Sequence, residues 1–238
     1  MTAVLNGKQV LAPPKDIAEV KNAYEIYERL DELDPYSVDD LLTAHGIMTR
    51  GLVEESGMFR TRPVGVVDQE GHVLHFGTLP QYVPDLVMEL LDWAKHSDLH
   101  MLIRSCVFHY ELELIHPFAD GNGRVGRLIM FKELLRIDAL PVLVHDAYRA
   151  EYVNGISKFP DEPGWLVDTL LFERDLYRSH VLKTDAEALR YTYHDQWNMA
   201  EHRVERDEDL EFAKLIDTKA QPLFDEEYQQ RERLLWGE

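Results

Sequence analysis

Residues 116–127 read HPFADGNGRVGR, and this stretch combines an imidazole, a carboxylate, two glycines beside an amide and two guanidinium groups. Apolar residues recur at helical spacing on both sides of it, over residues 102–115 and 128–135. The pattern predicts one helix that ends at Ile115 and a second that begins near Arg124. Residues 116–123 are therefore expected to form a short loop that leads directly into a helix.

Such a loop is suited to bind a phosphate group. At the start of a helix the first backbone N–H groups have no helical partner, and the helix dipole favours an anion there. Gly121 and Gly123 can adopt positive φ and let a phosphate approach the backbone without a Cβ in the way. Arg124 and Arg127 are three residues apart, so they share one face of the helix and can both reach a polyphosphate.

Two further side chains of the stretch add reactivity. Asp120 offers a hard oxygen ligand for Mg²⁺, and His116 can take a proton from an incoming hydroxyl group. Pro117 and Phe118 are more typical of a rigid turn and a core anchor. Each residue taken alone has an ordinary structural explanation, such as a turn or a helix cap. Their combination in this order predicts phosphoryl or nucleotidyl transfer.

Composition limits the class of protein and its partners. The 238 residues include 25 Lys and Arg against 44 Asp and Glu, a net charge of −19 that argues against binding nucleic acid. No apolar run approaches the roughly 20 residues that a membrane span needs. The N-terminus carries no secretory signal pattern, so we expect a cytoplasmic protein without a membrane partner. The single cysteine, Cys106, lies in an apolar helical pattern and is expected to be a core thiol.

The remaining patterns predict a mainly α protein with one β-hairpin. β-branched and aromatic runs at residues 64–67 and 73–76 are separated by DQEG at residues 68–71, which favours a hairpin. Asp16 and Ser37 are expected to cap the first two helices. Helices are expected at residues 16–33, 38–50, 84–97, 102–115, 124–137, 145–159 and 165–179. Residues 1–15 would then form an N-terminal extension, 16–179 one domain and 180–238 a charged helical arm.

The stretch at residues 116–127 matches the signature of the Fic family, HPFx(D/E)GNGRxxR, at all nine specified positions. His45, residues 57–60 and His109 are similar to the family pattern more weakly, and the resemblance covers roughly residues 18–173. It implies that residues 16–179 are a Fic domain, a helical bundle with a β-hairpin flap beside the active site. The implied activity is that of a protein adenylyltransferase, which transfers AMP from ATP to a Ser, Thr or Tyr hydroxyl of a target protein.

The resemblance also implies a role for each polar residue and glycine of the signature. The base would be His116, the Mg²⁺ ligand Asp120, the anion hole Gly121, Asn122, Gly123 and Arg124, and the γ-phosphate ligand Arg127. ATP as co-substrate and Mg²⁺ as cofactor follow from these roles. The adenine pocket would lie near Tyr152 and Asn154, and an ordinary core position explains Tyr152 equally well.

The expected partners are proteins. The hairpin at residues 64–76 resembles a flap that aligns the target by main-chain pairing over His116. Self-modification is compatible with the same chemistry. Many Fic proteins restrain themselves through a Ser/Thr-x-x-x-Glu-Gly/Asn motif, whose glutamate pairs with the second arginine of the signature.

This chain contains no match to that inhibitory motif, because the segments at residues 66–71 and 169–174 each agree with it only in part. We hypothesise that the chain lacks intrinsic autoinhibition. Loss of an N-terminal inhibitory helix, a separate inhibitory partner and a homo-oligomer are all left open.

Other readings of the same residues compete with AMP transfer. The fold could use another donor, such as a different nucleotide, phosphocholine or phosphate, or could remove AMP. A non-catalytic ATP-binding module that regulates other contacts is a second alternative, although its expected mark would be a degenerate signature. A metal hydrolase built on His45, His109 and His116 is a third, and these histidines lack the local spacing of metal ligands.

Overall fold

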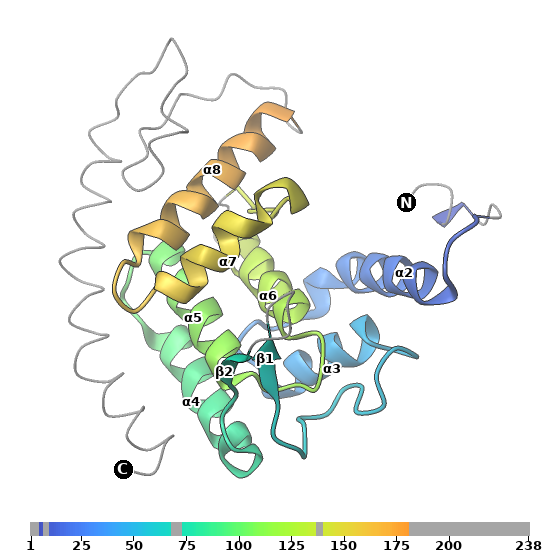
Figure 1. Ribbon diagram of the computed structural model, residues 1–238. Helices are drawn as coiled ribbons and strands as arrows, with labels where there is room; N and C mark the ends of the chain where they lie inside the picture. The colour runs from blue at the N-terminus through green and yellow to red at the C-terminus, as the bar shows by residue number, and fades with distance from the viewer. Residues whose placement is uncertain (1–4, 7–9, 68–72, 137–139, 181–238) are drawn as a thin grey trace. The chain divides into compact units, whose positions relative to one another are not determined.

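The computed structural model describes residues 5–6, 10–67, 73–136 and 140–180, and this part of the chain is mainly helical (Figure 1). The helices are α2 (Pro14–Glu28), α3 (Val38–Met48), α4 (Val83–His96), α5 (Met101–Ile115), α6 (Asn122–Arg136), α7 (Arg149–Lys158) and α8 (Gly164–His180). Short 3₁₀ turns are η1 (Leu30–Glu32), η2 (Pro80–Tyr82) and η3 (Asp146–Tyr148), and the strands are β1 (Gly65–Val67) and β2 (Val73–Phe76). The predicted C-terminal arm lies outside the described residues from 181 onward.

In the described part, the chain divides into two compact units. The first contains the residues up to Asp98 together with Glu111–Glu133, and the second contains Leu99–Tyr110 and the residues from Leu134 onward. All of residues 116–127 belong to the first unit, with α2, α3, α4 and both strands. The chemistry predicted for that stretch can therefore be examined within the first unit alone.

The first unit is built on amphipathic helices. Ser37 caps α3 as expected, because its hydroxyl accepts from the Asp40 N–H at 3.2 Å. Helices α2 and α3 pack together, as do α3 and α4. The inward face of α4 repeats at helical spacing and consists of Val83, Val87, Leu90, Leu91 and Ala94.

The two strands precede η2 and pair antiparallel. Gly65 lies opposite Phe76 and Val66 opposite His75, and the register shifts between Val66 and Val67. The Gly77 N–H extends the pairing by donating to the Val64 carbonyl at 3.1 Å. The residues that join the strands, 68–72, lie outside the described part.

The boundaries of α2, α6 and α7 differ from those expected. Helix α7 starts at Arg149, four residues after the expected start at His145, because η3 occupies Asp146–Tyr148. Helix α2 starts at Pro14, where proline is tolerated because the first N–H has no helical partner, so that Asp16 lies in the first turn and not at the cap. It ends at Glu28, and η1 follows. Helix α6 starts at Asn122, two residues before the expected start at Arg124. Gly123 consequently lies in the first helical turn and not in the loop.

The second unit contains α7 and α8, which pack closely. A Cβ on Gly155 would lie 2.9 Å from the Leu166 Cα, so this glycine permits the close approach. Cys106 is fully buried, which raises the pKa of its thiol and confirms the expected core position. Within the described ranges, no helix is long and apolar enough to cross a membrane.

Candidate active site

His116 lies directly after the last residue of α5. Its backbone has φ +52°, in the left-handed region that residues other than glycine rarely occupy, and Pro117 follows. Its ring Nδ1 lies 3.2 Å from the Glu113 carbonyl oxygen. A carbonyl can only accept a hydrogen bond, so Nδ1 carries the proton and, in the neutral ring, Nε2 is the nitrogen that accepts one. His116 is thus in the tautomer that a general base acting through Nε2 requires.

His45 braces the loop that follows His116. Its Nδ1 accepts from the Gly57 N–H at 3.0 Å, and its Nε2–H donates to the Asp120 carbonyl at 3.0 Å. The ring stacks on Phe118 with centroids 3.8 Å apart and planes 8° apart. Burial lowers the pKa of His45, which keeps the ring neutral and preserves its one donor and one acceptor. His45 is therefore a structural residue of the site.

Asn122 is a second brace for the same loop. Its side-chain oxygen accepts from the Phe118 N–H at 2.8 Å, and its side-chain nitrogen donates to the Phe118 carbonyl at 2.9 Å. The residue is almost fully buried. The Asn122 side chain is therefore hydrogen-bonded to the loop backbone, and the residue would take part in the expected anion hole through its backbone N–H.

The loop ends at a sharp turn into α6. Gly121 has φ +91°, and a Cβ at this position would lie 2.9 Å from Cγ2 of Thr49. The first helical hydrogen bond of α6 runs from the Val125 N–H to the Gly121 carbonyl at 3.0 Å. The N–H groups of residues 122–124 thus precede the helical ladder at the positive end of the helix dipole. This is the backbone arrangement that binds phosphate groups at helix N-termini.

The charged side chains of the site lie around this helix start. The Arg124 guanidinium lies between two carboxylates. Its Nη1 is 3.4 Å from Glu19 Oε1, and its Nη2 is 3.3 Å from Asp120 Oδ1. Glu113 Oε2 lies 3.9 Å from His116 Nδ1. Burial raises the pKa of Glu113 to about 7, and the charge of Arg127 partly opposes this shift. The site therefore contains a carboxyl group that titrates near neutral pH.

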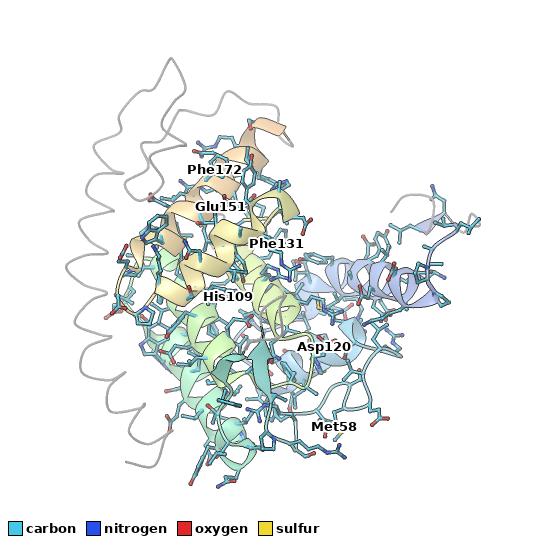
Figure 2. All side chains as sticks on the ribbon, viewed as in Figure 1. Met58, His109, Asp120, Phe131, Glu151 and Phe172 are labelled. Atoms are coloured by element: carbon cyan, nitrogen blue, oxygen red, sulfur yellow. The ribbon has the colours of Figure 1, made fainter. Side chains whose placement is uncertain are left out.

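Asp120 has the chemistry of a magnesium ligand. It lies in the loop that leads into α6 (Figure 2), its side chain is 55% exposed, and its Oδ1 accepts from the Gly121 N–H at 2.6 Å. Mg²⁺ in phosphate-transfer sites is commonly held by one or two carboxylates together with substrate phosphates. A single hard oxygen donor beside a helix N-terminus fits that mode of binding.

The arrangement of possible metal ligands in the described residues does not support a hydrolytic metal centre built on His45, His109 and His116. Among the residues that the structure describes, no group of three or more His, Cys, Asp or Glu side chains could hold a metal ion. Both ring nitrogens of His45 are hydrogen-bonded to the backbone. His109 belongs to the second unit, where its Nε2 is hydrogen-bonded to the hydroxyl of Tyr152.

Tyr152 itself is 4% exposed in α7, as expected for the core position that the sequence left open. Asn154, the other residue predicted near adenine, is exposed on the same helix.

All seven predicted site residues lie in the first unit, on the end of α5, the loop and the start of α6. Sequence reasoning missed Glu113, which contacts this site, and it included Arg60 only within the segment 57–60 that resembles the family pattern, without a role. Glu113 precedes His116 by three residues in the α5 pattern, so helical spacing could have identified it. Arg60 is 56 residues before His116, and no local pattern connects the two.

Comparisons with known proteins identify the family of the chain. The model of the Fic/DOC family matches residues 35–134. A solved structure of a Fic family protein from Desulfovibrio desulfuricans G20 is 34% identical in sequence and superposes with a TM-score of 0.67. The match covers 90% of this chain and 67% of the other protein's chain. The chain belongs to the Fic/DOC family.

Curated relatives include proteins named for an activity. A protein adenylyltransferase, fic-1 of Caenorhabditis elegans, is 32% identical over 126 residues, which are 51% of this chain and 23% of the relative. The protein adenylyltransferase Fic of Nematostella vectensis is 29% identical over 171 residues, 65% of this chain and 38% of the relative. The chain thus spans less than half the length of these curated relatives.

Proposed function

We propose that this chain is a protein adenylyltransferase, which transfers AMP from ATP to a Ser, Thr or Tyr hydroxyl of a target protein. Family membership and the names of the curated relatives support the reaction class. The observation that carries the proposal is the placement of two groups at opposite ends of one braced loop. A histidine with its proton on Nδ1 lies at one end, and the N-terminus of α6 with two arginines lies at the other.

In the proposed reaction, Nε2 of His116 takes the proton of the target hydroxyl. The hydroxyl oxygen attacks the α-phosphorus of ATP, the bond from that phosphorus to the bridging oxygen breaks, and pyrophosphate leaves. The N–H groups of residues 122–124 and the Arg124 side chain would stabilise the charge that develops on the phosphate oxygens. Arg127 would bind the γ-phosphate. The imidazolium that forms would be stabilised by the nearby Glu113 carboxylate.

Asp120 would hold Mg²⁺ together with the ATP phosphates. When bound, the ion would supply positive charge that orients the phosphates and neutralises them. Residues 64–76 would serve as the flap for the target protein. In the described part, β1 and β2 pair only with each other, so each strand has an outer edge on which an extended target segment could add main-chain hydrogen bonds.

Labelled ATP tests this function directly. The purified chain is incubated with Mg²⁺, a cell lysate and ATP labelled on either the α- or the γ-phosphate, beside the variant His116→Ala. We expect protein-bound label from α-labelled ATP alone, and its loss in His116→Ala by at least about 100-fold, because general-base catalysis contributes about 10²–10⁴. Protein-bound γ-label would instead mean phosphate transfer. The absence of label from both forms of ATP would contradict the proposal.

A further inference from the structure

Arg60 is a buried arginine whose side chain reaches only main-chain carbonyl oxygens in its hydrogen bonds. The residue is 2% exposed. Its Nε donates to the His116 carbonyl at 2.6 Å and its Nη1 to the Arg62 carbonyl at 2.9 Å. Its Nη2 donates to the Ile115 carbonyl at 3.2 Å and also to the Thr78 carbonyl. One planar guanidinium therefore joins carbonyls from three separate segments of the first unit.

Two of these carbonyls belong to the end of α5 and to the candidate base. The last carbonyls of a helix have no helical partner, and a cation at this end also interacts favourably with the helix dipole. Arg60 supplies the donors for Ile115 and His116, and its own N–H donates to the Pro117 carbonyl at 3.0 Å. Both peptide groups that flank the left-handed His116 are thus held by one residue, which restricts the direction in which its ring projects.

The other two carbonyls flank the strand pair. Arg62 precedes β1, and Thr78 follows β2. Gly77 lies between the Arg60 guanidinium and His116. A Cβ at this position would be 2.9 Å from Arg60 Nη2 and 3.0 Å from His116 Cβ. The guanidinium therefore holds the start of β1 and the end of β2 against the end of α5.

We propose that Arg60 is a positioning residue that holds His116 in register with the β1–β2 pair. The coupling rests on the proposed function, in which a target segment docks along these strands and its hydroxyl must meet His116 Nε2. Misplacement of reacting groups by about 1 Å can cost about 100-fold in rate. Lysine has a single point of charge and cannot reproduce the fork that contacts all four carbonyls. Arg60→Lys should therefore keep the buried charge and lose the alignment.

The test compares Arg60→Lys with the matched surface variant Arg29→Lys, since Arg29 is exposed and pairs with Glu32 at 2.8 Å. For each protein we would measure thermal unfolding, the Kd of Mg-ATP, and initial rates of AMP transfer from α-labelled ATP to lysate protein at varied ATP. We expect Arg60→Lys to lose about 10- to 100-fold in kcat, with the KM and Kd for ATP changed by less than about threefold. Arg29→Lys should match the unmodified chain.

A second variant disturbs the contact between Arg60 and His116 through Gly77, the residue that follows β2. Gly77→Ala places a methyl group against both Arg60 and His116 and should give the same loss of kcat at unchanged KM. It decides the question if Arg60→Lys does not fold. Unmodified kcat in the folded variants would overturn the proposal. So would a parallel loss of stability, ATP affinity and kcat, which is what a merely structural role produces.

Imidazole ¹⁵N spectra separate this proposal from the proposed function. In the unmodified chain, His116 should carry its proton on Nδ1. In Arg60→Lys and Gly77→Ala, this preference should weaken, because the peptide groups on both sides of the ring are released. If the unmodified chain transfers no AMP, the adenylyltransferase function fails and these spectra alone decide the role of Arg60. Unchanged His116 signals in both variants would then overturn it.

Discussion

Glu113 and His116 form a pair of titratable residues within one turn at the end of α5. The carboxylate lies 3.9 Å from the imidazole, and its pKa is raised to about 7 mainly by burial. The neutral form of this carboxyl group therefore persists to higher pH in the folded protein than in a free glutamate side chain. Its ionised form would favour proton uptake by His116, and its neutral form would not.

The raised pKa of Glu113 predicts a pH-dependent effect of Glu113→Gln on stability. In the unfolded chain this carboxyl ionises around pH 4.5, whereas in the folded chain it ionises around pH 7. The unmodified protein therefore loses stability from this group as pH rises from 4.5 to 7. Glutamine does not ionise, so the variant should equal the unmodified protein near pH 4.5 and exceed it by about 1–3 kcal/mol at pH 8. Urea unfolding at both pH values measures this, and a pH-independent difference would refute it.

At the scale of elements, the site depends on how the loop enters α6. His45 and Asn122 hold the loop backbone from two sides, and Gly121 makes the turn at φ +91°. If the helix started at Arg124, its first free N–H groups would lie two residues farther from the loop. The earlier start places the N–H groups of residues 122–124 at the loop itself.

Gly121→Ala tests this turn, and Gly51→Ala is its control. Both glycines have positive φ, +91° and +72°, so each alanine variant should lose about 1–2 kcal/mol from backbone strain. A Cβ on Gly51 meets nothing within 4 Å, whereas one on Gly121 meets Thr49 at 2.9 Å. Gly121→Ala should therefore lose more stability than Gly51→Ala, and only Gly121→Ala should weaken Mg-ATP binding. Equal losses in urea unfolding and in ATP titration would contradict this account of the turn.

At the scale of the whole molecule, the seven candidate residues between His116 and Arg127 lie in one compact unit, while α7, with Tyr152 and Asn154, belongs to the other. The chain carries no Ser/Thr-x-x-x-Glu-Gly/Asn segment that could pair with Arg127. We therefore propose that the residues of this chain carry no intrinsic autoinhibition.

Appending a helix with the inhibitory motif to the N-terminus of the chain tests this proposal. We expect the fusion to lower AMP transfer, because its glutamate would compete with the γ-phosphate for Arg127. The same fusion with glutamine in place of the glutamate is the control and should retain activity. The readout is label from α-labelled ATP together with ATP affinity. A fusion that changes neither would refute the idea.

The residues proposed to bind and react are local in sequence, and this is why the signature and the helix pattern could point to them. His116, Asp120 and the two arginines lie within twelve consecutive residues, and the helices on both sides follow from apolar spacing. Apolar spacing alone does not fix where a helix begins or ends, because side chains near the helix ends form hydrogen bonds with backbone groups there. Asn122 begins α6 with its amide bonded to Phe118, and no propensity indicates that contact.

The amino-acid sequence was sufficient to define the family signature, the mainly helical class and the residues proposed for the site. It could not reveal the contacts that hold those residues in place, since Arg60 meets His116 across 56 residues and His45 meets Asp120 across 75. Local periodicity carries no information about such separations. The Arg60 contact exists only in the folded chain, where the carbonyls at the end of α5 need hydrogen-bond donors and this arginine supplies them.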